Sequence, residues 1–167
     1  ANIIRGNSGA NRLNGGAGVD KLFGNAGNDV LIGGSGIDDM RGGTGNDRYS
    51  VDNSRDVIRE GSNQGTDLVY SSVTYTASSN VENLSLRGSG NINGTGNSSA
   101  NIIRGNSGAN RLNGGAGVDK LFGNAGNDVL IGGSGIDDMR GGTGNDRYSV
   151  DNSRDVIREG SNQGTDL

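Results

Sequence analysis

Apolar side chains recur every nine residues in the first part of the chain. From Gly6 the sequence reads GNSGANRLN, GGAGVDKLF, GNAGNDVLI, GGSGIDDMR and GGTGNDRYS. The last three residues of each repeat predict a short β-strand whose middle side chain points inward, because side chains alternate along a strand. The first six residues are rich in Gly and predict a turn. The expected inward residues are Leu13, Leu22, Leu31, Met40 and Tyr49.

Two such repeats make one coil of eighteen residues, with a strand on each side and a turn at each end. Successive coils are expected to pair as parallel strands, with the inward side chains forming a ladder. The turns carry three regular columns. Gly occupies the first and fourth positions throughout, and Asn7 and Asn25 replace Gly at the second position, where Asn tolerates left-handed backbone next best. The sixth position carries Asn11, Asp20, Asp29, Asp38 and Asp47.

A longer period of 99 residues contains the shorter one. Residues 1–68 reappear unchanged as residues 100–167. This divides the chain into a module at 1–99, with nonapeptides at 6–50 and looser β coils at 51–99, and a truncated copy at 100–167. A natural tandem array and an engineered duplication both account for the identity. Because it begins at Ala1 without a Met, the chain is expected to be a segment of a longer protein.

The stretch between the nonapeptide blocks also predicts β-strands, since its segments carry β-branched and aromatic residues and are bounded by Gly, Ser and Asn. Counting inward residues from Ile4 to Ile103 gives ten half-turns, or five coils. Each module would then continue the previous one in phase, as one solenoid. The alternative is that 51–93 forms a flexible spacer. The inward residues expected here are Ile58, Val69, Leu84, Ile92 and Ile103.

Composition narrows the chemistry. Only 29% of residues are hydrophobic, which suits either a disordered chain or a thin-cored solenoid. The chain has no Cys or His, so it has no disulfide, no thiolate zinc site and no His general base. Two identical copies without a convergent cluster off the repeat register predict that it is not an enzyme. A net charge of −4 argues against nucleic acid as a partner, and no apolar stretch approaches a membrane span.

The oxygen donors that remain suit calcium. Stacking at eighteen residues places Asp20 beside Asp38 and Asp29 beside Asp47. Carboxylates stacked so closely repel each other and resist joint ionisation. A divalent cation between the turns removes that repulsion, and turn carbonyls can complete a shell of six to eight oxygens.

The repeats resemble the RTX family, whose nonapeptide is GGxGxDxUx. The resemblance implies a right-handed parallel β-roll with calcium between neighbouring coils. It also implies that each site takes the second and fourth carbonyls and the Asp of one turn, with the first and third carbonyls and the Asp of the turn eighteen residues later. In the first copy the two sites comprise Gly16, Gly18, Asp20, Gly33, Ser35 and Asp38, and Asn25, Gly27, Asp29, Gly42, Thr44 and Asp47. In the second copy they comprise Gly115, Gly117, Asp119, Gly132, Ser134 and Asp137, and Asn124, Gly126, Asp128, Gly141, Thr143 and Asp146.

Departures from the family pattern predict weaker sites. Asn11 and its copy Asn110 are neutral where the family has Asp. Asp56 and its copy Asp155 keep the position-six register in a segment that has lost its glycines, and they could still close a site with the Asp before them.

The repeats and their expected calcium sites predict a structural function. The chain would be a calcium-stiffened module of a secreted bacterial surface array, filament or large adhesin, with several calcium ions per module and self-association or tandem assembly as its interactions. The alternative is a β-roll that binds an anionic polysaccharide along a basic face, through Arg12, Lys21, Arg41 and Arg48.

Overall fold

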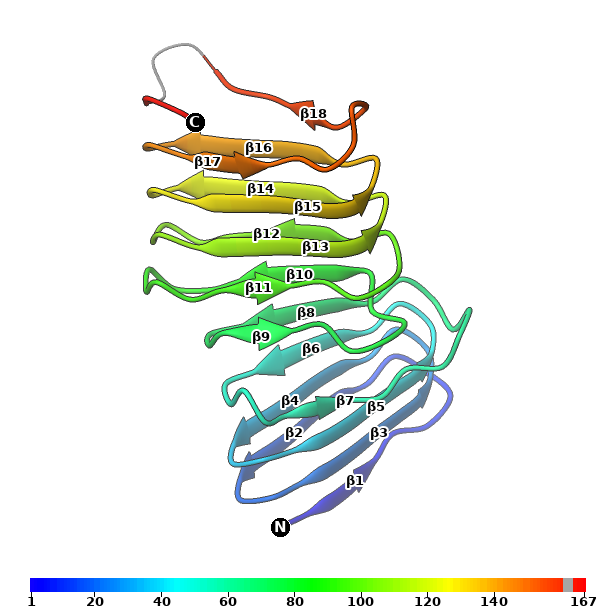
Figure 1. Ribbon diagram of the computed structural model, residues 1–167. Helices are drawn as coiled ribbons and strands as arrows, with labels where there is room; N and C mark the ends of the chain where they lie inside the picture. The colour runs from blue at the N-terminus through cyan, green and yellow to red at the C-terminus, as the bar shows by residue number, and fades with distance from the viewer. Residues whose placement is uncertain (161–163) are drawn as a thin grey trace.

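The described part of the chain, residues 1–160 and 164–167 of a computed structural model, is a parallel β-solenoid (Figure 1). These residues contain no helix, so none is long and apolar enough to cross a membrane. The strands are β1 (Ile3–Arg5), β2 (Arg12–Ala17), β3 (Lys21–Ala26), β4 (Val30–Ser35), β5 (Asp39–Thr44), β6 (Arg48–Val51), β7 (Val57–Ile58), β8 (Leu68–Ser71), β9 (Tyr75–Thr76), β10 (Asn83–Leu86), β11 (Gly94–Thr95), β12 (Ile102–Arg104), β13 (Arg111–Gly117), β14 (Lys120–Ala125), β15 (Val129–Gly135), β16 (Asp138–Thr143), β17 (Arg147–Ser149) and β18 (Val156–Ile157).

The strands alternate between two faces of the roll. All even-numbered strands, from β2 to β18, form one nine-stranded sheet. The odd-numbered strands form two sheets on the other face, one of β1, β3, β5 and β7 and one of β9, β11, β13, β15 and β17. Within the nonapeptides the register is the expected eighteen residues, as in the pairing of Leu13 with Leu31 and of Leu22 with Met40. The β-roll predicted from the nine-residue period is therefore confirmed.

The core is a narrow column between the two faces. The inward residues expected from the nonapeptides are all buried, and so are Ile58, Val69, Leu84 and Ile103 from the looser segment. Ile92 is only partly buried, because it precedes β11 and packs against the core from outside the strand. The inward position of β11 itself is Gly94, and a methyl group there would touch Leu84, Ile103 and Leu112 at 3.3–3.5 Å.

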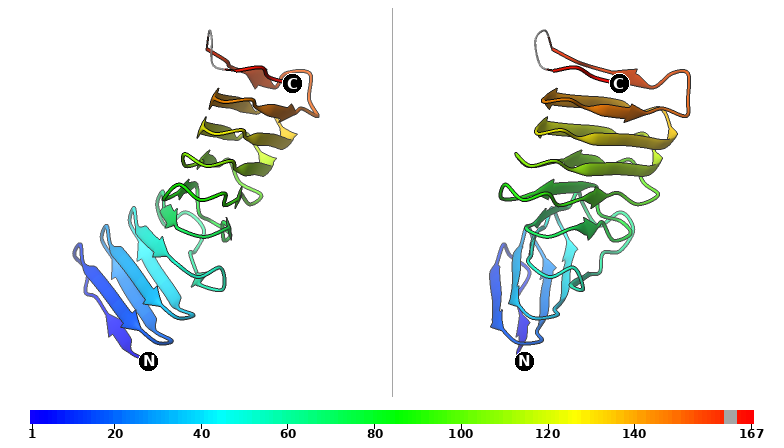
Figure 2. Two further views of the ribbon diagram at one scale, coloured as in Figure 1. Left: turned by 90° about the vertical axis from the view of Figure 1, so that its left-hand side faces the viewer. Right: turned by 60° about the vertical axis from the view of Figure 1, so that its left-hand side comes forward.

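The segment between the nonapeptide blocks forms coils of unequal length. Tyr49 pairs with Val69, Val69 with Leu84, and Leu84 with Ile103. The nine-stranded sheet continues through these coils, but β7 and β9 do not pair, so the opposite face is split between them. Figure 2 shows that the roll bends at this split. These residues are part of the roll, and the flexible-spacer alternative is not what the structure shows.

The count of ten half-turns per module is wrong, because the structure has eleven. The interval from Val69 to Leu84, read from the sequence as one half-turn, contains the short strand β9 with Tyr75 buried. An odd number of half-turns exchanges the faces. β1 lies in the four-stranded sheet, whereas its identical copy β12 lies in the nine-stranded sheet. The second copy is therefore half a turn out of phase with the first.

Candidate calcium sites

The sixth position of each turn stands directly before a strand, so these residues stack along both edges of the roll. Beside the nine-stranded sheet they form a long ladder of Asn11, Asp29, Asp47, Asp67, Glu82, Asn101, Asp119, Asp137 and Asp155. Two short ladders lie at the opposite edge, one of Asn2, Asp20, Asp38 and Asp56 and one of Asn110, Asp128, Asp146 and Asp166.

Eight Asp residues in these ladders use their two carboxylate oxygens differently. Oδ1 accepts a hydrogen bond from the backbone N–H of the residue one coil earlier, as in the 2.8 Å bond from Asp20 N to Asp38 Oδ1. Oδ2 is buried and has no hydrogen-bond partner. The eight residues in this state are Asp20, Asp29, Asp38, Asp47, Asp119, Asp128, Asp137 and Asp146.

Buried oxygens without partners are costly, and more so when they carry charge. Burial raises the pKa of Asp47, Asp119 and Asp128 to about 6, and the carboxylate in the adjacent coil adds to the rise. The pKa of Asp38 is raised for the same two reasons. A cation would supply the missing partner for Oδ2 and remove the repulsion. The donor set therefore fits a metal ion, and carboxylate and carbonyl oxygens are the ligands that calcium prefers.

The first-position glycines make room for these carboxylates. Gly15 does not have a positive φ, but a methyl group there would lie 2.6 Å from Asp20 Oδ2 and 2.5 Å from the carbonyl oxygen of Gly33 in the next coil. Asp20 Oδ2 and the Gly33 carbonyl therefore face the same space. Positive φ is confined to later turn positions, and Asn25, at φ 80°, shows that Asn does replace Gly at the second position. Asn7 is different, because it does not adopt positive φ.

The carbonyl groups expected as ligands lie between the coils. Gly16 and Gly18 of the lower turn direct their carbonyls against Gly34 and Gly36 of the next coil. The Ser35 carbonyl accepts a 2.8 Å hydrogen bond from Gly18 N, which leaves it a second lone pair. The same arrangement of carbonyl oxygens recurs in the other turns. The residues that supply these carbonyls are Asn25, Gly27, Gly42 and Thr44 in the first copy and Gly115, Gly117, Gly132, Asn124, Gly126, Gly141 and Thr143 in the second.

The turns that contain Asn11 and Asn110 are closed by hydrogen bonds of the Asn side chains. Asn11 Oδ1 accepts a 2.7 Å bond from Asn7 N, and Asn7 Oδ1 accepts one from Gly9 N. In the second copy Asn110 additionally donates its side-chain amide to Ile92 O at 2.7 Å. An amide carries its own donor, so it makes direct contacts to neighbouring polar groups where the carboxylate needs a cation. This is the physical reason to expect weak or no binding at Asn11 and Asn110.

Asp56 and Asp155 continue their ladders as expected, since each accepts a 3.0 Å bond from the backbone N–H of the Asp one coil earlier. The structure also brings to the sites three acidic residues that were not predicted from the sequence, Asp67, Glu82 and Glu60. The sequence does contain a pattern that indicates Asp67, because Gly65, Thr66 and Asp67 match the fourth to sixth positions of a nonapeptide. Two extra residues in that turn lengthen the spacing from Asp47 to Asp67 to 20 residues, against 18 in the regular ladder.

The four basic residues considered for polysaccharide binding do not share a face. Lys21 and Arg41 lie on β3 and β5, whereas Arg12 and Arg48 lie on β2 and β6 of the opposite sheet. Arg41 is also 3.6 Å from Asp39 in an ion pair. The expected basic face is therefore not formed.

Comparison with protein families gives four matches to the RTX calcium-binding nonapeptide repeat, at residues 1–31, 23–58, 95–130 and 122–157. These matches span most of the chain, and the chain belongs to this family of calcium-binding repeats. A search of curated proteins found no match.

Proposed function

We propose that the chain is a calcium-dependent structural module of a secreted bacterial surface array, filament or large adhesin. The single observation that supports this most strongly is the set of eight buried Asp oxygens without a partner, stacked in register along both edges of the roll. The Asp and carbonyl groups named above would hold one ion between each pair of neighbouring Asp-containing turns. RTX repeats occur in secreted bacterial proteins, which supports an extracellular location.

Calcium would supply most of the stability of such a module. Extracellular calcium sites bind at about 10⁻⁴–10⁻³ M, so the sites fill outside the cell and empty inside it. At a tenfold excess over Kd each site contributes roughly 1.4 kcal/mol. Several sites together approach the roughly 5–15 kcal/mol that stabilises a typical domain. The fold is then a rod that becomes stiff on export.

Circular dichroism with and without a chelator tests this proposal. The β spectrum is expected only with calcium, and magnesium at the same concentration should not replace it, because magnesium gives up its water reluctantly. A β spectrum that is unchanged in chelator would contradict the calcium-dependent role. Binding to alginate or to a glycan array at physiological salt would instead support the polysaccharide alternative, for which the dispersed basic residues give little support.

A further inference from the structure

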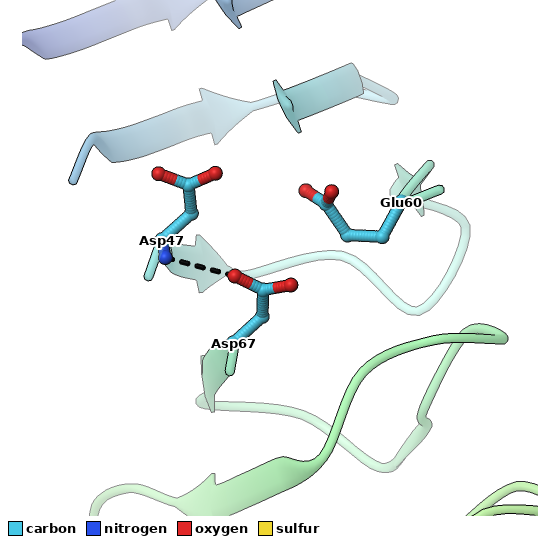
Figure 3. A group of neighbouring side chains, drawn as sticks. All are labelled: Asp47, Glu60 and Asp67. Carbon is cyan, nitrogen blue, oxygen red and sulfur yellow. Dashed lines mark hydrogen bonds between the residues drawn. The ribbon is translucent and has the colours of Figure 1, made fainter. Parts of the chain in front are cut away.

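One acidic cluster includes a residue from outside the position-six ladders. Asp47 precedes β6, Glu60 follows β7, and Asp67 precedes β8, so three separate segments bring their carboxylates together. One oxygen from each lies within 4.8 Å of the others. Figure 3 shows Glu60 reaching across the coil toward the two stacked Asp side chains.

These carboxylates are oriented but not neutralised. Asp67 Oδ1 accepts a 2.8 Å bond from Asp47 N, drawn in Figure 3. Glu60 Oε1 accepts a 3.0 Å bond from Gly42 N and a further bond from the Tyr49 hydroxyl. The second oxygen of each of Asp47 and Glu60 is buried without a partner, and Asp47 is only 1% exposed. Among the described residues, no Lys or Arg forms an ion pair with any of the three.

We propose that Asp47, Glu60 and Asp67 form a three-carboxylate calcium site, distinct from the two-carboxylate sites between nonapeptide turns. This inference rests on the calcium-binding role proposed above and adds a site of a different composition. Calcium affinity rises with the number of charged ligands, so this site should bind more tightly than the paired sites. Burial and the neighbouring carboxylates raise the pKa of Glu60 to about 8 and that of Asp67 to about 6, as expected where acidic groups converge without a counter-charge.

The site would also stabilise the most irregular part of the roll. Glu60 and Asp67 bracket the turn that joins β7 to β8, just before the split between β7 and β9. This turn lies in the looser part of the first copy and does not follow the nonapeptide pattern. An ion that joins both of its ends to Asp47 would fix the path of the chain where regular pairing is lost on one face.

The second copy repeats the cluster on the opposite side of the roll. Asp146, Glu159 and Asp166 again place one oxygen each within 4.8 Å of the others, in a more exposed setting. Both copies therefore have to be changed together in any test.

Terbium luminescence excited through tyrosine tests the proposal on the full chain, because the Tyr49 hydroxyl contacts Glu60. The test variant is Glu60→Gln with Glu159→Gln, which keeps the side-chain shape and an acceptor for Gly42 N. The tightest terbium phase should disappear, and calorimetry should count one calcium ion fewer per copy. The matched control, Asp20→Asn with Asp119→Asn, should lose ions from the paired sites and keep the tightest phase.

An unchanged ion count and unchanged affinities in the Glu variant would overturn the proposal, while calcium-induced β structure in the same samples would leave the general calcium role intact. Conversely, a wild-type chain that gains no β structure with calcium would refute the general role. If the Glu variant does not fold, Tyr49→Phe with Tyr148→Phe provides a second readout. That variant should lose most of the luminescence of the tightest phase, and undiminished luminescence would also refute the site.

Discussion

Replacing Asp38 should cost about twice as much as replacing Asp20, because the two residues have different neighbours in their ladder. Asp38 lies between Asp20 and Asp56, whereas Asp20 lies between Asn2 and Asp38. Asp38→Asn therefore removes a ligand from two sites and Asp20→Asn from one. At a tenfold excess of calcium each lost site costs roughly 1.4 kcal/mol, so the expected losses are about 2.8 and about 1.4 kcal/mol per copy.

The variants are best made in both copies, as Asp38→Asn with Asp137→Asn and Asp20→Asn with Asp119→Asn. Asn retains Oδ1 as the acceptor for the backbone N–H one coil earlier, so the ladder hydrogen bond survives. Urea unfolding in about 10 mM calcium, roughly tenfold above the weakest extracellular Kd, gives the stability, and calorimetry gives the number of ions.

The same substitution should have the opposite effect without calcium. Burial raises the pKa of Asp38, which means that its charged form is disfavoured in the fold, and a neutral amide avoids that penalty. In chelator the β signal of the Asp38 variant should therefore equal or exceed that of the wild type. Equal ion losses in the two variants would refute the stacking register. Changes within about 0.5 kcal/mol in both conditions would show that these are ordinary surface carboxylates.

Three further outcomes are expected. Gly33→Ala with Gly132→Ala should lower the stability by about 1–3 kcal/mol per copy and abolish a calcium site, because the methyl group would meet the Asp38 carboxylate. The control Gly90→Ala should be neutral, because the space around Gly90 is open, and urea unfolding with ion counting separates the two variants. Asn11→Asp with Asn110→Asp should add up to one calcium ion per copy by calorimetry while weakening the β signal in chelator, since the amide contacts that close those turns are lost. In calcium-free buffer, β structure should be greatest below about pH 4 and be lost as pH rises through about 6, because burial raises the folded-state pKa of several ladder carboxyls from 3.8 to about 6. Circular dichroism measured as a function of pH tests this, and β structure that increases with pH would contradict it.

The nonapeptide part of the fold could be predicted because each column has one dominant physical cause. The inward Leu residues, the eighteen-residue register and the stacked Asp side chains all follow from strand alternation and turn length. The first-position glycines are an exception. They leave room for an Asp carboxylate, as Gly15 does for Asp20. This role depends on the conformation of the Asp side chain, which the backbone pattern does not predict.

The looser segment was harder to predict because its half-turns leave weak marks. The inward residue of β11 is Gly94, which has no side chain and therefore gives no hydrophobic signal. β9 contains only Tyr75 and Thr76, too few residues to show alternation. Glu60 lies outside the position-six column, and Asp67 is displaced from the regular spacing by two extra residues. The three-carboxylate cluster therefore becomes visible only when the coils are stacked.

Eleven half-turns per 99 residues mean that one module never looks like the next from a fixed direction. The split between β7 and β9 faces one side of the roll, and the copy of β7, β18, lies on the other side. Wherever identical modules follow each other, their bends would point alternately in opposite directions and cancel over each pair. A filament of such units would be straight on average although every unit is bent. Its true axial repeat would be two modules, eleven coils or roughly 53 Å at about 4.8 Å per coil. A partner that binds one side of the filament would find the same surface only once every two modules.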